Sequence, residues 1–334
     1  MSSSDPNIPP FDSAFRPAPV RAGSRLPDSA NLSVSGAAVP AGAVSGARAV
    51  RADPLAVFRR IVPRDHALLA LLAEHYLLST PQIAAAFFDN RRTAQRRLTT
   101  LHRLDVVHRF AYPNLEHTAV PYLYTLGPVG LQLYPDAYHD PDHRHAKIPR
   151  TSLERARRIA ASASATHLLG VNQFFIDLLA TARHQPGSAL LRWWSEQHAT
   201  NVYAQSNIRP DGHGIWTAEG RTVGFFLEHD RDTEDVPRVI AKLRAYARLT
   251  EFGPRYPVLL WLPTPARQAN VLRLLAGVHT PMPVATAVHG PDPAGRVWTL
   301  TTDLPANPNH RRRLHDLPSD HGPRSGTNPG HYHH

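Results

Sequence analysis

The 334-residue chain contains no cysteine. A disulfide framework is therefore excluded, and no thiolate is available to bind zinc. The chain also lacks any apolar run near the roughly 20 residues that a membrane-spanning helix needs. Its first residues lack the basic and apolar segments of a secretory signal. We therefore expect a cytoplasmic protein that does not enter a membrane.

Lysine is almost as scarce as cysteine. Only Lys147 and Lys242 are lysines, so 35 of the 37 basic residues are arginines. The net charge of +10 predicts a polyanionic partner, with nucleic acid ahead of an anionic membrane surface. A GC-rich genome would also favour arginine, alanine and proline, and this second explanation of the charge stays open.

Composition divides the chain into five parts. Residues 1–55 and 304–334 are rich in proline, glycine and small or polar residues without helical or strand periodicity, and we expect disordered tails there. Residues 58–134 and 151–303 carry periodic apolar patterns. A linker rich in proline, histidine and aspartate separates them at 135–150. The sequence therefore predicts two folded domains between two tails.

The first domain has the periodicity of three helices followed by two strands. Helices are expected at residues 64–78, 81–88 and 91–104, and strands at 106–111 and 121–126. Thr80 is expected to cap the second helix, with Pro81 in its first turn. With residues 112–120 as the loop between the two strands, this order resembles a winged helix-turn-helix.

The third of these helices has a basic face. Ala94, Leu98 and Leu101 share its apolar side. The opposite side carries Arg91, Arg92, Gln95, Arg96 and Thr99. In a helix-turn-helix this helix lies in the major groove, where arginine can bond guanine and glutamine can bond adenine. We therefore predict that this face binds double-stranded DNA, against the simpler interpretation that it is a solvated helix face.

The second domain alternates helices with strands. Helices are expected at residues 151–163, 167–184, 237–249 and 268–275, and strands at 189–194, 207–210, 222–228, 256–262, 283–288 and 296–300. Residues 212–220 are expected to join the second and third strands as a hairpin connection. This order is that of an α/β layer fold with a mixed sheet, and it resembles a restriction-endonuclease-like fold. The predicted fold class is thus a multidomain α/β protein, a winged helix-turn-helix followed by a restriction-endonuclease-like domain.

Three acids are expected at one end of this second domain's sheet. Asp211 lies in a Pro-Asp-Gly turn, Glu228 ends the next strand, and Asp230 shares the face of Glu228 because side chains alternate along a strand. Carboxylate oxygens bind Mg²⁺, which would polarise a phosphodiester and lower the pKa of an attacking water. We predict Asp211, Glu228 and Asp230 as metal ligands. Asp211, Glu228 and Lys242 are the predicted catalytic residues of a Mg²⁺-dependent endonuclease.

The pattern departs in one respect from that of nucleases with this fold. Their lysine usually lies two residues after the second acid, where this chain has Asp230, and Lys242 follows Glu228 by 14 residues on the next helix. Some members carry the lysine on that helix. Two interpretations therefore stay open, namely a rearranged active site or a nuclease fold that binds DNA without cutting it. Taken alone, Asp211 suits an ordinary turn, and Lys242 suits a solvated helix position.

Eight motifs occur together along the chain. They are Arg64-Asp-His-Ala-Leu-Leu69, Thr80-Pro-Gln-Ile83, Arg96-Arg-Leu98, Tyr122-Leu-Tyr-Thr-Leu-Gly127, His167-Leu-Leu-Gly-Val-Asn172, Ile208-Arg-Pro-Asp-Gly212, Phe226-Leu-Glu-His-Asp-Arg-Asp-Thr-Glu234 and Lys242-Leu-Arg-Ala-Tyr246. In this combination, over about residues 58–278, the chain resembles the replication-relaxation family of actinobacterial plasmids, integrative elements and chromosomes. The resemblance implies a role in plasmid replication or transfer, with DNA and replication or conjugation proteins as partners. Asp232 replaces a small residue of the family pattern, and its charge would weaken phosphate approach or add a metal ligand.

Other functions remain compatible with the sequence. A transcriptional regulator would bind an operator through the first domain and dimerise or bind an effector through the second. A scaffold in a replication or transfer complex would have no measurable DNA affinity of its own. A relaxase is disfavoured because the candidate nucleophiles Tyr122, Tyr124 and Tyr246 lack an accompanying three-histidine metal signature.

Overall fold

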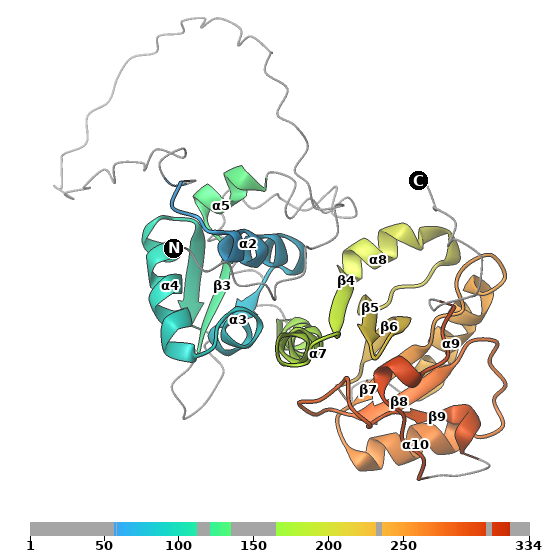
Figure 1. Cartoon of the computed structure of the whole chain (residues 1–334). Coiled ribbons are helices and arrows are strands. Elements are labelled where there is room, and N and C mark those ends of the chain that lie inside the picture. Colours follow the sequence, from blue (N-terminus) through green and yellow to red (C-terminus); the bar gives the residue numbers. More distant parts are fainter. Residues whose placement is uncertain are drawn as a thin grey trace, which may run out of the picture.

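The described part of the chain is a mixed α/β structure with two sheets (Figure 1). The computed structural model describes residues 57, 59–111, 121–134, 165–231, 236–304 and 309–320. The predicted tail 1–55, loop 112–120, linker 135–150 and helix 151–163 lie outside these residues. Within the described ranges, no helix combines the length and apolar character needed to cross a membrane.

Residues 59–111 and 121–134, here called the N-terminal unit, pack helices against a three-stranded antiparallel sheet of order β1-β3-β2. Its elements are α2 (Pro63–His75), β1 (Leu78–Ser79), α3 (Thr80–Phe87), α4 (Arg91–Arg103), β2 (Val107–Ala111), β3 (Tyr122–Leu126) and α5 (Pro128–Leu133). The helices α2, α3 and α4 and the strands β2 and β3 confirm the sequence prediction to within three residues at each end. Strand β1 and helix α5 are too short to leave a periodic pattern, and neither was expected.

The start of α3 is set by a local cap. Ser79, rather than the expected Thr80, is the N-cap: its hydroxyl accepts from the backbone N–H of Gln82, whose side chain accepts in return from the N–H of Ser79 (2.8 Å). Thr80 instead donates its hydroxyl to the carbonyl of Tyr122 in β3. The expectation was wrong by one residue because serine and threonine are both good caps. Asn90 caps α4 with its side-chain oxygen.

Residues 165–231, 236–304 and 309–320, here called the sheet unit, are built on a six-stranded sheet of order β4-β5-β6-β7-β8-β9. Its elements are α7 (Ala165–His184), β4 (Ala189–Ser195), α8 (Glu196–Val202), β5 (Gly212–Ala218), β6 (Arg221–His229), α9 (Val236–Leu249), β7 (Val258–Leu262), α10 (Pro265–Leu275), β8 (Val284–Val288) and β9 (Thr299–Leu300). Strands β4, β5 and β6 are antiparallel neighbours, β6, β7 and β8 are parallel, and β9 is antiparallel to β8. The mixed sheet was predicted, whereas α8 was not.

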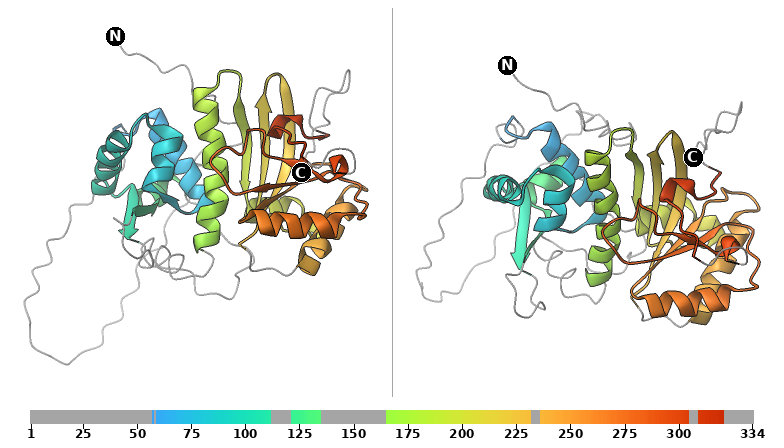
Figure 2. Two further views of the ribbon diagram at one scale, coloured as in Figure 1. Left: turned by 90° about the horizontal axis from the view of Figure 1, so that it is seen from below. Right: turned by 60° about the horizontal axis from the view of Figure 1, so that its bottom comes forward.

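Different helices cover the two faces of the large sheet. Phe225 and Leu227 of β6 belong to the buried cluster that includes Phe174 of α7, whereas Phe226 belongs to the cluster that includes Leu243 of α9. This alternation follows because successive side chains of a strand point to opposite faces. Figure 2 shows α7 lengthwise, between the helices of the N-terminal unit and the sheet. Helices α9 and α10 pack on the other face.

Strand β5 occupies the stretch for which we expected a hairpin connection, and the strand expected at 207–210 is irregular backbone instead. A glycine of this stretch allows close packing between the strands. A Cβ added to Gly214 would lie 2.3 Å from the ring of Phe225. The actual turn consists of Glu219 and Gly220, both with positive φ, as a tight two-residue hairpin requires.

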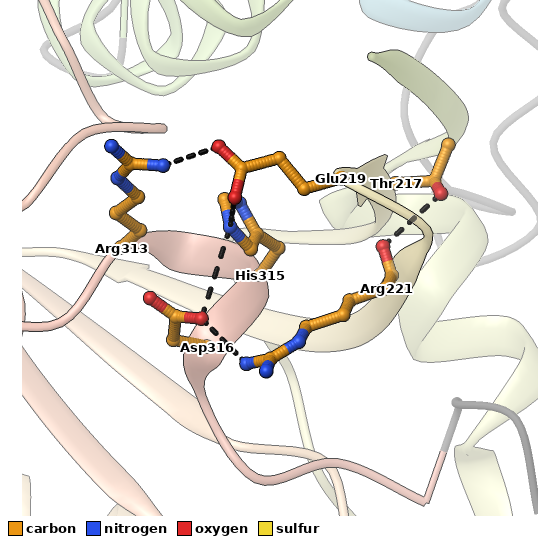
Figure 3. A network of polar contacts seen from close by, with 6 residues as sticks. All are labelled: Thr217, Glu219, Arg221, Arg313, His315 and Asp316. Atoms are coloured by element: carbon orange, nitrogen blue, oxygen red, sulfur yellow. Dashed lines mark hydrogen bonds and ion pairs between the residues drawn. The ribbon is translucent and has the colours of Figure 1, made fainter. Parts of the chain in front are cut away.

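The predicted disordered tail at 304–334 is wrong for residues 309–320, which pack on the sheet unit. Leu314 is fully buried, and Arg312 forms a β-bridge with Trp298. Charged side chains of this segment pair with the β5–β6 hairpin, namely Arg313 with Glu219 and Asp316 with Arg221 (Figure 3). The composition is typical of a tail, but two buried leucines, Leu314 and Leu317, and these ion pairs order the segment. Such distant partners leave no local signal.

Candidate functional site

Asp211 and Glu228 lie at one edge of the large sheet, where β5 begins and β6 ends. The antiparallel register pairs Gly212 with Leu227, and the backbone N–H of Asp211 donates to the carbonyl of Leu227 (3.0 Å). Residues that are 17 positions apart in the sequence are therefore neighbours across two strands. The β5–β6 hairpin alone therefore brings Asp211 and Glu228 close together.

Glu228 is buried and accepts two hydrogen bonds from α9. Lys242 donates to Oε2 (2.7 Å) and Tyr246 donates to Oε1 (2.5 Å). The two donors are four residues apart, which places them one turn apart on the same helix face. Burial and the nearby charge of Asp211 raise the pKa of Glu228 to about 7, against the opposing effect of Lys242. Burial therefore favours the protonated form of this carboxyl group, and the Lys242 contact opposes it.

Asp211 is held by groups from α7 and β6. Its Oδ2 accepts from the backbone N–H of His229 (2.7 Å), and its Oδ1 lies 3.0 Å from Nε2 of His167. Burial lowers the pKa of His167, but the hydrogen bond and charge of Asp211 outweigh it, so the pKa is raised overall. His167 was not among the predicted site residues, although it opens one of the motifs named above.

Asp230 is on the same face as Glu228, as the alternation predicted, but it has a different partner. Its Oδ2 accepts from Nε of Arg267 in α10 at 2.7 Å, and both side chains are about nine-tenths buried. Within the described ranges, no group of three or more histidine, cysteine or acidic residues is arranged to hold a metal ion. The two acids left for Mg²⁺ are Asp211 and Glu228. They suit it because Mg²⁺ commonly takes one or two carboxylates and keeps several waters.

Further residues of α7, α8 and β6 lie near the two acids. Glu196, the first residue of α8, has its pKa raised by burial and by the charge of Asp211, so it lies within electrostatic reach. His229 stacks on His289 (ring centroids 4.4 Å apart), and burial lowers its pKa to about 4. A Cβ on Gly170 would lie 2.6 Å from His229. The motif glycine of α7 therefore makes room for a ring beside the site.

The predicted DNA-binding residues lie on α4, away from these acids. Arg91, Arg92, Gln95 and Arg96 are exposed and Thr99 is half-buried. Their neighbour Arg97 turns inward and pairs with the buried Asp65 of α2. That pair joins α4 to α2 and leaves the other arginines on the outer face, as the helical period predicts.

Comparison with family models assigns the chain. The model described as replication-relaxation matches residues 69–258, more than half of the chain. The chain belongs to the replication-relaxation family. The match begins in α2 and ends at the start of β7, so it includes α4 and all three predicted catalytic residues. No curated protein and no solved structure gave a significant match. Membership in this replication-relaxation family suggests a role in replication or in the function of mobile elements.

Proposed function

We propose that this replication-relaxation protein binds double-stranded DNA through α4 and nicks it at a Mg²⁺-dependent site made by Asp211, Glu228 and Lys242. The process served is the replication or transfer of a plasmid or mobile element, with replication or conjugation proteins as further partners. The observation that carries the proposal is the contact of Lys242 with Glu228. One of two lysines in the chain reaches the acid beside Asp211 from a separate helix.

The proposed roles follow from the contacts. Asp211 and Glu228 would hold Mg²⁺, which supplies phosphate polarisation and a more acidic water when bound. Lys242 would stabilise negative charge that develops on the phosphate. Tyr246 orients the Glu228 carboxylate, because burial and the adjacent charge of Glu228 raise its pKa well above the ordinary value and keep the phenol a hydrogen-bond donor. His167, which belongs to α7, would orient Asp211 through the contact of its Nε2 with Oδ1.

The proposal for DNA binding rests on the N-terminal unit. Three helices, the last with an exposed basic face, are followed by an antiparallel strand pair, and β1 joins that pair as a third strand. This is the arrangement expected of a winged helix-turn-helix, whose last helix enters the major groove. The sheet unit supports the nuclease proposal in a similar way. An antiparallel hairpin followed by parallel strands places acids at the sheet edge, as expected of a restriction-endonuclease-like fold.

A plasmid-nicking assay tests the enzyme. Supercoiled plasmid is incubated with the full chain and Mg²⁺ or Mn²⁺, and the open-circular product is measured. Wild type should nick, whereas Asp211→Ala and Glu228→Ala should each abolish measurable nicking, since each would remove a metal ligand. Glu251→Ala, an exposed acid beyond α9, is the matched control and should retain activity. No nicking by wild type with either metal would reject the nuclease.

A second candidate, DNA binding without cleavage, is favoured by the saturation of the acids. Both oxygens of Glu228 and both of Asp211 already accept hydrogen bonds, and Asp230 is paired with Arg267. Such a protein would act as a transcriptional regulator or a replication scaffold. It would shift DNA equally well in EDTA and in Mg²⁺ and leave no strand breaks, whereas the nuclease would leave breaks only with metal.

A further inference from the structure

The five tryptophans of the chain differ in exposure. Four of them, Trp193, Trp216, Trp261 and Trp298, are at most 4% exposed, whereas Trp194 is half-buried. Trp193 and Trp194 are neighbours in β4, so their side chains point to opposite faces of the large sheet. Trp194 is therefore the one tryptophan that solvent reaches to a substantial extent.

Trp193 belongs to the contact between the two units. Its ring stacks on His75 of α2, with ring centroids 3.7 Å apart, and on Phe175 of α7, with centroids 4.9 Å apart. The N-terminal unit and the sheet unit therefore meet on this face of β4. Packing between the units accounts for Trp193, but the ring of Trp194 points the other way.

Trp194 is part of a stack of flat side chains, here called the β4 strip and made of Arg192, Trp194 and His198. The ring of His198 stacks on that of Trp194, with centroids 4.7 Å apart and 8° between the ring planes. The guanidinium carbon of Arg192 lies 4.4 Å from the centre of the Trp194 ring. Nδ1 of His198 lies 3.2 Å from Oε1 of Glu74, a contact that orients the imidazole. Since all three members are half-buried, the β4 strip is an ordered stack with a solvent-exposed side.

The β4 strip lies at the edge of the large sheet. Strand β4 is the first in the strand order, so one of its edges has no neighbouring strand among the described residues. Figure 1 shows α8, which carries His198, next to β4. Ser195, which follows Trp194, pairs with Gly212, which follows Asp211. The β4 strip is therefore open at the sheet edge and close to the strand end that carries Asp211.

The charge of the β4 strip is positive. Within the described residues, the guanidinium of Arg192 forms no ion pair. The nearby acid Glu196 has an arginine of its own, because Arg209 lies 4.0 Å from its carboxylate. Proteins bind unpaired nucleic acid with this combination of groups, since bases stack on aromatic rings and guanidinium planes while arginine binds the phosphates. In a duplex the bases are stacked on one another and cannot reach such a surface.

We propose that the β4 strip binds an unpaired strand of DNA. A base stacks on the Trp194 ring in place of the Arg192 guanidinium, which then binds the adjacent phosphate. This exchange is favourable because stacking of a base on an aromatic ring stabilises more than a partly exposed cation–π contact. The inference goes beyond the proposed function, because it requires neither α4 nor a metal ion. Unpaired strands arise wherever a duplex is opened for copying or transfer.

Tryptophan fluorescence tests this inference in the full chain. An oligomer of about 15 thymidines, which forms no duplex, is titrated into the protein in EDTA. A base that stacks on tryptophan quenches its fluorescence, and four of the five tryptophans are too buried to respond. Wild type should therefore show partial quenching. Anisotropy of a dye-labelled oligomer measures the affinity independently.

Substitutions then assign the quenching to the β4 strip. Trp194→Ala should lower the affinity for the oligomer about 5- to 100-fold, the cost of losing one stacking ring. Trp194→Tyr keeps an aromatic ring, so it should retain the affinity within about threefold and abolish the quenching. Phe252→Ala removes a 64% exposed ring from the turn after α9 and is the matched control, which should bind and quench like wild type.

Arg192→Ala provides a variant that leaves the Trp194 ring in place. It should lower the affinity for the oligomer and reduce the slope of log affinity against log salt concentration by about 0.7, the value for one phosphate contact on a single strand. Arg273→Ala, an exposed position of α10, should leave the slope unchanged. Urea denaturation of each variant verifies that it is folded.

The outcomes separate the β4 strip from the proposed function. Binding without quenching, together with unchanged affinity in Trp194→Ala, would overturn the β4 strip and leave duplex binding by α4 untouched. Equal quenching by a duplex of the same length would overturn the preference for an unpaired strand. Replacing Arg91, Arg92 and Arg96 by alanine should weaken duplex binding only, and loss of the quenching as well would overturn a separate site on β4. Quenching by the oligomer without any duplex shift would support the β4 strip and reject α4.

Discussion

The two units of this replication-relaxation protein use charge in opposite ways. On α4, Arg91, Arg92 and Arg96 are exposed, and none makes an ion pair within the part of the chain that the structure describes. In the sheet unit, Glu228 and Asp230 are buried, and each meets a cation from a helix. Exposed charges attract a polyanion over a distance, whereas buried pairs hold groups in position at a cost in desolvation. The difference fits the proposed division between a helix face that binds DNA and a site that holds groups in position.

The largest expected effect concerns the Asp230–Arg267 pair. Arg267→Ala leaves Asp230 buried without its cation, so the free energy of unfolding should fall by about 3–5 kcal/mol. Urea denaturation measures it, and Arg273→Ala, an exposed position of the same helix, should change it by less than about 0.5 kcal/mol. A small loss in Arg267→Ala would mean that this ion pair contributes little to the free energy of unfolding. The contrast between buried and exposed charge would then be weaker.

The second prediction compares the only two lysines. Lys242→Ala should reduce nicking by about 100- to 1,000-fold, the usual cost of losing one donor that stabilises transition-state charge. Lys147→Ala removes the same charge elsewhere in the chain and should leave the rate unchanged. Equal rates in both variants would remove Lys242 from the proposed chemistry while leaving DNA binding intact.

The third prediction tests the exposed charges of α4. Replacing Arg91, Arg92 and Arg96 together by alanine should lower DNA affinity about 100-fold at low salt. The slope of log affinity against log salt concentration should decrease by the amount that corresponds to about three lost phosphate contacts. Electrophoretic shifts over a salt series measure both. The matched triple, Arg244, Arg248 and Arg273 to alanine, removes as many exposed charges from the sheet unit and should change binding less. Equal losses would show that net charge, not α4, captures DNA.

The smallest expected effect lies where the two units meet. Burial lowers the pKa of His75 to about 4 in the folded protein, so the unfolded chain binds more protons between about pH 6.5 and 4. Stability should therefore be present above pH 6.5 and be lost as the pH falls through this window. His75 accounts for about 2 kcal/mol of that loss by pH 5. Urea denaturation at pH 7.5 and pH 5 should show a smaller difference for His75→Phe, which keeps the ring stack on Trp193. His279→Phe is the exposed control.

Local periodicity was a reliable guide where one face of an element is buried. The face of α4 was predicted from Ala94, Leu98 and Leu101, and all three are fully buried. The alternation along β6 correctly placed Glu228 and Asp230 on one face. These predictions succeed because the spacing of side chains in a helix or strand depends on backbone geometry alone.

The sequence predictions were wrong where the structure of a segment depends on residues outside that segment. Residues 212–220 were predicted as a hairpin connection, but most of them form β5, in which Gly214 leaves room for the ring of Phe225. The segment 309–320 has the composition of a tail, yet Leu314 reaches the core. In both cases the decisive neighbour is distant in sequence, and no local pattern contains it.

The sequence by itself determined which residues face outward on α4, which acids share an edge of the sheet, and that Lys242 is a rare residue type in this chain. Only the tertiary structure decided that Lys242 reaches Glu228, that Arg267 takes Asp230, and that His167 reaches Asp211 from α7. The physical reason is that an element's own geometry sets the direction of a side chain. The identity of the group it meets depends on how crossovers and buried helices bring distant segments together.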